Sequence, residues 1–308
     1  MLVVVLALSL DFLVTSGLKK TEVGDFQVWN DIYNSRVTGG VVISGSSRAA
    51  RSINPAVLDS ALSVNSYNLG NDAYYFYMQY ARYQVFAKYN PKPKLIIQTT
   101  DFNTLWNTGS TNKVQFAPYN DPLLDSFLEN IGFKPNELNT PVYRYFSEIS
   151  AVKLGLANQL GLDKVFYKDK IRYKGYQATY SEWNRRELDN ILNVSGKIKV
   201  HNQPEMATLL DDFLSECKNN DIQVVMVFVP EYIEAINTTE STNATAVLDL
   251  YNSLSEKYNF PFLDYSRDTI CNNIEYFYNA LHLNSRGADL FTQKLARDID
   301  LLGIMPEN

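Results

Sequence analysis

Short apolar runs alternate with longer amphipathic segments along most of this chain. Runs rich in β-branched residues and bounded by turn-forming residues predict five strands, over residues 40–44, 63–69, 94–99, 222–229 and 261–265. Apolar residues at helical spacing predict helices over residues 72–89, 244–258 and 286–301. Alternating strands and helices are typical of an α/β fold, and we expect three layers around a doubly wound, mostly parallel sheet.

The last predicted helix carries its apolar residues on one face and has a candidate cap directly before it. The cap is Asn284 or Ser285, whose side chain can accept from the free N–H groups of the first turn. We expect the helix to pack on the sheet through its apolar face, which consists of Ala288, Phe291, Leu295 and Ile299.

The stretch between the third and fourth predicted strands, about residues 104–220, breaks the alternation of strands and helices. Within it, residues 172–177 indicate an extended or hairpin segment. An insertion after the carboxyl end of a parallel strand stands beside the edge where such sheets bind ligands. We therefore expect a single domain over residues 21–308 whose insertion shapes access to a site.

The N-terminus begins with an apolar run over residues 2–14, which contains Asp11 and is followed by Lys19 and Lys20. The run is shorter than the roughly 20 residues that span a bilayer, and no basic residue precedes it. Three interpretations are open: a signal-anchor, a cleaved signal peptide, or a buried core element. We expect residues 1–20 to be one of the first two, which place the protein at the periplasm or cell surface.

Charge and cysteine content exclude several classes of protein. The chain has 28 Lys and Arg against 34 Asp and Glu, a net charge of -6, and its basic residues are scattered, so a nucleic-acid groove is not expected. Its two cysteines, Cys217 and Cys271, are too few for a disulfide scaffold. No cluster of His, Cys and Asp has the spacing of metal ligands, and we expect neither a metal nor a cofactor.

One histidine and one serine stand where parallel-sheet enzymes keep catalytic groups. The chain has only two histidines; His201 lies in a polar stretch, whereas His282 lies in a tight loop shortly before the last helix. An imidazole at such an element edge can take a proton from a hydroxyl and return it to a leaving group. Ser47 follows the first predicted strand at a Gly-containing turn that leads into a helix, which exposes its hydroxyl at the carboxyl edge of the sheet.

Three short blocks carry a resemblance to a known family. These are Gly-Ser-Ser-Arg at 45–48, Asn-Leu-Gly at 68–70, and His-Leu-Asn at 282–284 followed by Gly-Ala at 287–288. In type and order they resemble the SGNH (GDSL-type) hydrolase superfamily. The resemblance implies that Ser47 is the nucleophile, that His282 is the base, and that the N–H groups of Ser47 and Gly70 hold the oxyanion.

The chain departs from the pattern of this superfamily at two places. Asn279 stands three residues before the histidine, where the family usually has an Asp that orients and charges the imidazole. The family's Gly-x-Asn-Asp block is missing after the third strand, where the matching segment is 95–103, and we expect Asn103 to supply a further oxyanion donor. Cys-His-Asn proteases work with an amide in the position of Asn279.

The resemblance implies a serine esterase or an O-acyltransferase, in particular an acetyltransferase, that acts on a small acyl ester or an acetylated cell-envelope polysaccharide. Arg144 and Lys174, in the predicted insertion, are candidate contacts to an acidic sugar. The two departures motivate an alternative, a weakened or inactive binding and assembly module of the envelope. The acyl donor, the acceptor and the oligomeric state are left open.

Overall fold

The computed structural model describes residues 1–107 and 112–304, which form two compact units. The described part of the first unit comprises residues 1–37, 81–90 and 112–172, and that of the second comprises residues 38–80, 91–107 and 173–304. The sequence predicted one domain over residues 21–308 with an insertion over 104–220. The structure differs, because much of that insertion packs with the N-terminal residues as a unit of its own.

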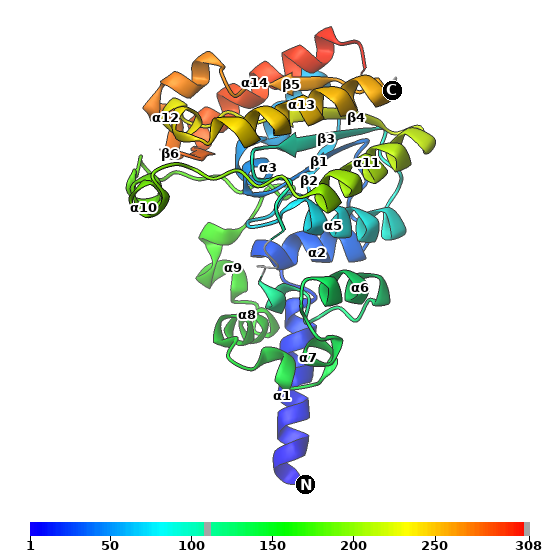
Figure 1. Cartoon of the computed structure of the whole chain (residues 1–308). Coiled ribbons are helices and arrows are strands. Elements are labelled where there is room, and N and C mark those ends of the chain that lie inside the picture. The colour runs from blue at the N-terminus through cyan, green and yellow to red at the C-terminus, as the bar shows by residue number, and fades with distance from the viewer. Residues whose placement is uncertain (108–111, 305–308) are drawn as a thin grey trace. The chain divides into compact units, whose positions relative to one another are not determined.

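The second unit is built on a five-stranded parallel sheet (Figure 1). The strand order is β2-β1-β3-β4-β5, so the chain reverses its winding direction between β1 and β3, and the doubly wound α/β prediction is confirmed. Each predicted strand is present with slightly different ends. The strands are β1 (Val41–Ser44), β2 (Ser66–Asn68), β3 (Leu95–Thr100), β4 (Gln223–Phe228) and β5 (Phe262–Asp264).

Helices cover the sheet as the apolar patterns predict. The helix α14 (Ser285–Leu301) buries Ala288, Phe291, Leu295 and Ile299 in a core cluster with Ile43, Ile97 and Val225 of the sheet. Asn284 caps this helix by accepting from the N–H of Gly287 at 3.0 Å. The other helices of this unit are α3 (Ser47–Ser52), α4 (Pro55–Leu62), α10 (Arg186–Ser195), α11 (Pro204–Asn219), α12 (Ile233–Thr238) and α13 (Ser241–Tyr258).

Replacing Phe291 by Ala should lower the free energy of unfolding by about 3–5 kcal/mol, because it removes a fully buried ring from the core. The ring packs edge-on against Tyr265 with their centroids 5.1 Å apart. Leu290, the preceding residue, is 38% exposed and is the matched control, for which Ala should cost about 0.5 kcal/mol or less. Chemical denaturation of both variants checks this, and equal losses would contradict the packing of α14.

The first unit is helical. It contains α1 (Leu2–Leu18), α2 (Gly24–Tyr33), α6 (Pro122–Asn130), α7 (Pro135–Asn139), α8 (Ile149–Gln159) and α9 (Asp163–Phe166), with 3₁₀ turns η1 (Lys113–Gln115), η2 (Tyr143–Tyr145) and η3 (Lys168–Lys170). The helix α5 (Phe76–Tyr89) belongs to it from Ala81 onward. Trp29 is fully buried; its indole N–H donates to Gln115 at 3.1 Å, and the Arg82 guanidinium lies 4.5 Å from its ring.

The N-terminal helix α1 packs on α8 only through its second half. Gly17 and Gly155 allow the two backbones to touch, since a Cβ on Gly17 would lie 1.9 Å from the carbonyl oxygen of Gly155. Val14 and Leu18 are buried there, whereas most apolar residues before Asp11 are exposed, so α1 is not an ordinary core element. Among the described residues, no helix combines the length and hydropathy needed to cross a membrane.

Candidate active site

Ser47 stands at the sharp turn between β1 and α3. Gly45 permits this turn because a Cβ there would lie 1.8 Å from the hydroxyl oxygen of Thr99 on the neighbouring strand. Ser46 caps α3 by accepting from the N–H of Arg48 at 3.3 Å. Ser47 is therefore the first residue of the helix, and its N–H has no acceptor within the helix. Both its hydroxyl and its N–H are available to one reacting group.

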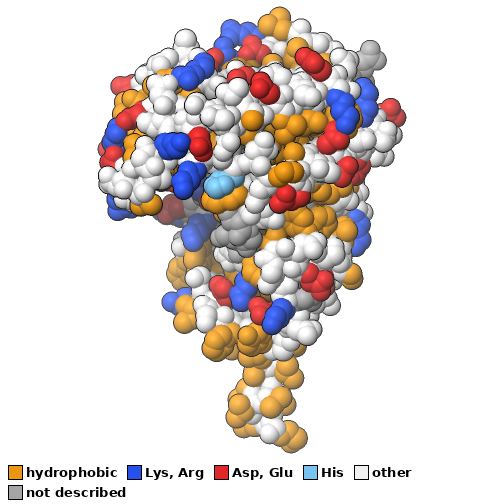
Figure 2. Space-filling model, viewed as in Figure 1, with side chains coloured by type: hydrophobic (Ala, Val, Ile, Leu, Met, Phe, Trp, Pro, Cys, Tyr) orange, Lys and Arg blue, Asp and Glu red, His pale blue; other side chains and the backbone are white. Residues whose placement is uncertain are grey.

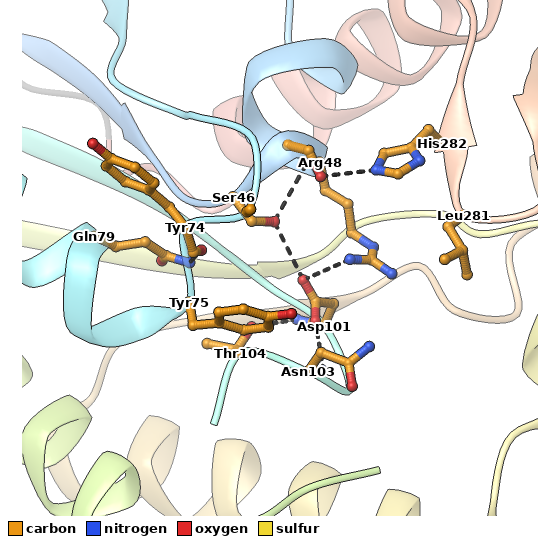
Figure 3. Close-up of a pocket in the computed structure, with 12 residues that line it drawn as sticks. Ser46, Arg48, Tyr74, Tyr75, Gln79, Asp101, Asn103, Thr104, Leu281 and His282 are labelled. Carbon is orange, nitrogen blue, oxygen red and sulfur yellow. Dashed lines mark hydrogen bonds and ion pairs between the residues drawn. The ribbon is translucent and has the colours of Figure 1, made fainter. Parts of the chain in front are cut away.

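His282 reaches the serine from the hairpin of β6 (Phe277–Asn279) and β7 (His282–Leu283). Its Nε2 lies 2.8 Å from the Ser47 hydroxyl oxygen, although the two residues are 235 positions apart in the chain. This interaction is one of the dashed lines in Figure 3. The Tyr278 ring stacks beside the imidazole, with centroids 5.4 Å apart and 14° between planes, which holds the ring orientation. The 2.8 Å between His282 Nε2 and the Ser47 hydroxyl oxygen is short enough for direct proton transfer.

Asn279 fixes the tautomer of this histidine. Its side-chain oxygen lies 3.0 Å from His282 Nδ1 and also accepts from the N–H of Leu281 at 3.0 Å. Because an amide oxygen only accepts hydrogen bonds, Nδ1 carries the proton and Nε2 is left with the lone pair that faces Ser47. The amide thus performs the orienting part of the role expected at this position.

Glu187, at the start of α10, is a member of the site that the sequence analysis missed. Its carboxylate accepts a hydrogen bond from the Asn279 side-chain nitrogen at 2.5 Å. A carboxylate is therefore present, but the Asn279 amide lies between it and the imidazole, whereas in an Asp-His pair the carboxylate contacts the imidazole directly. Neither spacing nor periodicity relates two residues that lie 92 positions apart, and an acidic residue in the first turn of a helix is ordinary in itself.

The pKa of His282 lies well below 6.5. Burial of the ring is the main cause, and the positive charges of Arg48 and Arg51 add to it. Each effect disfavours the imidazolium, so the neutral base predominates at neutral pH. The ring is therefore ready to accept the Ser47 proton.

Ser47 and His282 open into a small cavity of about 150 Å³ (Figure 3). This volume is below the roughly 300–1,000 Å³ typical of sites for drug-sized ligands. A short acyl group fits such a space better than a long chain does. Its lining also includes Ser46, Arg48, Ala73, Tyr74, Tyr75, Gln79, Asp101, Asn103, Thr104 and Leu281.

A buried ion cluster supports one wall of this cavity. Arg48 contacts Asp101 at 3.1 Å and Glu231 at 2.6 Å, and all three side chains are almost fully buried. Burial raises the pKa of Glu231 to about 7, while the neighbouring Arg48 opposes the rise. Asp101 also accepts from the Ser46 hydroxyl at 3.4 Å. The cluster therefore ties the turn that presents Ser47 to the end of β3.

The predicted oxyanion donors are not equally well placed. The Gly70 N–H donates to the side-chain oxygen of Asn68 at 2.9 Å, and Gly70 is not among the residues that line the cavity. Asn103 does line it, on the same side as Asp101, whose carboxylate accepts from the Asn103 N–H at 2.6 Å (Figure 3). Of the three predicted donors, Ser47 and Asn103 therefore line the cavity and Gly70 does not.

The two cations predicted to contact an acidic sugar have other partners. Arg144 belongs to the first unit and forms an ion pair with Asp11. Lys174 donates to the Asp59 carboxylate and to the Asn65 amide, both at 2.6 Å. Neither residue lines the cavity at Ser47, and the structure does not support a substrate contact for either.

Two further results concern metal ions and thiols. In the part of the chain that the structure describes, no group of three or more His, Cys, Asp or Glu is placed to hold a metal ion. Cys217 and Cys271 are both buried, and no disulfide joins these two residues.

The sequence matches no family model and no curated protein sequence. Several solved structures are similar. One, described as an acylhydrolase from Bacteroides fragilis, has a TM-score of 0.42 and 11% identity over 86% of this chain and 88% of its own. A lipase/acylhydrolase from Enterococcus faecalis has a TM-score of 0.39 and 12% identity over 87% of this chain and 98% of its own.

A third similar structure comes from Desulfitobacterium hafniense and is described as a lipolytic protein of the G-D-S-L family. It has a TM-score of 0.38 and 12% identity over 83% of this chain and 97% of its own. At these identities the similarity concerns the fold.

Proposed function

We propose that this protein is a serine ester hydrolase or O-acyltransferase of the SGNH type, with Ser47 as nucleophile and His282 as base. The observation that carries the proposal is the continuous chain of hydrogen bonds from Ser47 through His282 and Asn279 to Glu187. A nucleophile, a base and a group that orients the base are the parts that acyl transfer through a covalent intermediate requires.

The reaction follows from these positions. His282 Nε2 takes the Ser47 proton while the serine oxygen bonds to the acyl carbon, and the oxyanion receives hydrogen bonds from the Ser47 N–H and the Asn103 amide. The imidazolium then protonates the leaving alkoxide, which yields an acyl-serine. Water or a sugar hydroxyl then gives its proton to His282 and attacks the acyl carbon. The imidazolium returns that proton to the Ser47 oxygen as the acyl–serine bond breaks, which restores both residues.

Glu187 acts in this scheme as a positioning residue. It holds the Asn279 amide nitrogen, so the amide oxygen stays directed at His282 Nδ1. Its negative charge also polarises the amide and favours the imidazolium that forms in the transition state. The pair Asn279 and Glu187 thus takes over the two roles, orientation and charge, of a single Asp.

The substrate class follows from the size of the cavity and the character of its lining. Acetyl or a similarly short acyl group matches about 150 Å³, and an acetylated cell-envelope polysaccharide is the substrate we propose. Tyr75, which lines the cavity and is partly exposed, can pack on a sugar ring. The alternative, a binding module without catalysis, rests on Asn279 in place of an Asp and on the missing Gly-x-Asn-Asp block.

Covalent labelling tests the proposal directly. A fluorophosphonate should add one label to the folded protein at Ser47, read by intact mass and peptide mapping. p-Nitrophenyl acetate should be hydrolysed faster than the butyrate and octanoate esters. Folded protein that takes up no label and hydrolyses none of these esters would refute catalysis and favour the binding module.

The pH dependence should reflect the lowered pKa of His282. Because the neutral ring is the active form, kcat/KM for p-nitrophenyl acetate should stay constant as the pH falls through 6.5 and decline only at more acidic pH. The sign follows from burial, which disfavours the proton on the ring. A plot of kcat/KM against pH, limited to the range where circular dichroism shows intact fold, checks this. An acidic limb centred at or above pH 6.5 would contradict it.

A further inference from the structure

We propose that the first unit binds the surface of a lipid bilayer through two segments that are distant in sequence. One is the exposed half of α1, residues 2–13, and the other is an apolar patch that we define as the exposed side chains of Val142, Tyr143, Phe146, Ile149, Val165 and Phe166. This inference is independent of the chemistry proposed at Ser47.

Exposed large apolar side chains are concentrated in this unit. In the second unit they are fewer and are spread over several elements, for example Val194 on α10 and Leu301 on α14. In the first unit, Phe146 is 73% and Phe166 is 66% exposed, and nearly every apolar residue of α1 before Asp11 is exposed as well. Figure 2 shows the side chains of α1 as an almost continuous hydrophobic surface. A contiguous apolar surface of this kind marks an interaction site.

Direct contacts join both parts of the apolar patch to the N-terminal segment: η2 lies beside Asp11, and α9 lies beside Thr21, whose hydroxyl donates to Asp163 at 2.5 Å. The Val142 N–H and the Arg144 guanidinium both donate to the Asp11 carboxylate, at 2.8 and 2.9 Å. Tyr143 and Phe146 stack within the patch with centroids 6.2 Å apart. Further along α1, the Gln159 amide donates to the Leu13 carbonyl at 3.0 Å. The turn η2 and the end of α8 therefore lie against α1 at the level of residues 11–13 (Figure 1).

The charges of this region fit a bilayer. Asp11 is the only charged residue of α1, and it is 6% exposed and paired with Arg144, so α1 presents no free charge. Lys168 and Lys170 are exposed close to Phe166, with the exposed Asp169 between them, and can meet anionic headgroups. This distribution of charge suits α1 and the apolar patch lying together against the bilayer interface.

Site-specific fluorescence tests this with the full chain. Both native cysteines are buried, so a thiol-reactive NBD probe reports on an introduced cysteine. Phe146→Cys and Phe166→Cys sample the patch, Leu6→Cys samples α1, and Val194→Cys, 89% exposed in the second unit, is the control. On mixing with phosphatidylcholine/phosphatidylglycerol vesicles, NBD emission should shift to the blue at positions 6, 146 and 166 but not at 194. A shift at position 6 alone, or at none, would overturn the proposal.

A second measurement separates lipid binding from self-association. Phe146→Glu combined with Phe166→Glu should weaken co-flotation with these vesicles at least tenfold, because two exposed rings that would contact the bilayer are replaced by charges. Val194→Glu should leave flotation unchanged. Thermal unfolding followed by circular dichroism should be the same in all variants, which shows that they fold. Concentration-dependent dimers that the double variant abolishes, without any loss of flotation, would assign the patch to a second copy instead.

Discussion

Replacing Ser47 by Ala should abolish fluorophosphonate labelling and lower kcat for p-nitrophenyl acetate by roughly 10⁴-fold or more. The loss is large because the variant has no oxygen at 2.8 Å from His282 Nε2 with which to form the acyl intermediate. The stability of the fold should change little, since the hydroxyl is not part of the core. Labelling, steady-state kinetics and thermal unfolding of the same preparation check all three statements.

Ser46 supplies a matched control for this experiment. It is adjacent, it has the same chemistry, and its hydroxyl caps α3 and contacts Asp101. Ser46→Ala should cost about 1 kcal/mol of stability through the lost cap while keeping the label on Ser47. If Ser46→Ala rather than Ser47→Ala removed the label, the nucleophile would be misassigned.

Replacing Asn279 by Asp should not by itself raise activity, because Glu187 already occupies the far side of this residue. The two carboxylates would meet at the 2.5 Å contact now made by the Asn279 nitrogen, and two like charges at that distance cannot both ionise. They would share a proton, and the imidazole would gain little. Asn279→Asp combined with Glu187→Gln should raise kcat above the wild type by roughly tenfold to 100-fold, since a lone carboxylate then faces Nδ1.

The single variant Glu187→Gln isolates the charge behind the amide. It preserves the shape of the side chain and should lower kcat by about tenfold with little change in KM. ¹⁵N NMR of the imidazole distinguishes an electrostatic role from a purely structural one. The Nδ1–H resonance of His282 should shift in this variant, whereas the resonances of His201 should stay constant. The wild type, the two single variants and the double variant form a double-mutant cycle. Equal activity of all four proteins would show that neither Glu187 nor Asn279 takes part in the mechanism.

The fold of the second unit could be predicted because its signals are local. Each strand is a short run of β-branched residues between turn formers, and the apolar face of residues 288–299 has the spacing of a buried helix. Alternation of such segments leaves few topologies other than a parallel sheet. The first unit could not be predicted in this way, because α1 and α2 find their partners in residues 112–172, and no local pattern records that pairing.

The candidate site was predictable where motifs carry it. Ser47 and His282 stand at element edges with recognisable neighbours, and the structure brings them together. Gly70 could not be judged from the motif, because the motif does not reveal that the Asn68 side chain accepts the Gly70 N–H. Glu187 could not be found at all, since only the folded chain brings the start of α10 to the β6–β7 hairpin.

The ion cluster behind the nucleophile bears on selectivity. Arg48 follows Ser47 directly and lines the cavity, yet both ends of its guanidinium are already engaged by Asp101 and Glu231. Because the pKa of Glu231 is raised to about 7, this acid is only partly ionised at neutral pH, and the wall carries little net charge. A succinyl or phosphoryl group would therefore find no free Arg48 guanidinium with which to form an ion pair, so its charge gains nothing at this wall. The lack of an ion-pair site for charged acyl groups is thus a consequence of the contacts that hold the serine turn in place.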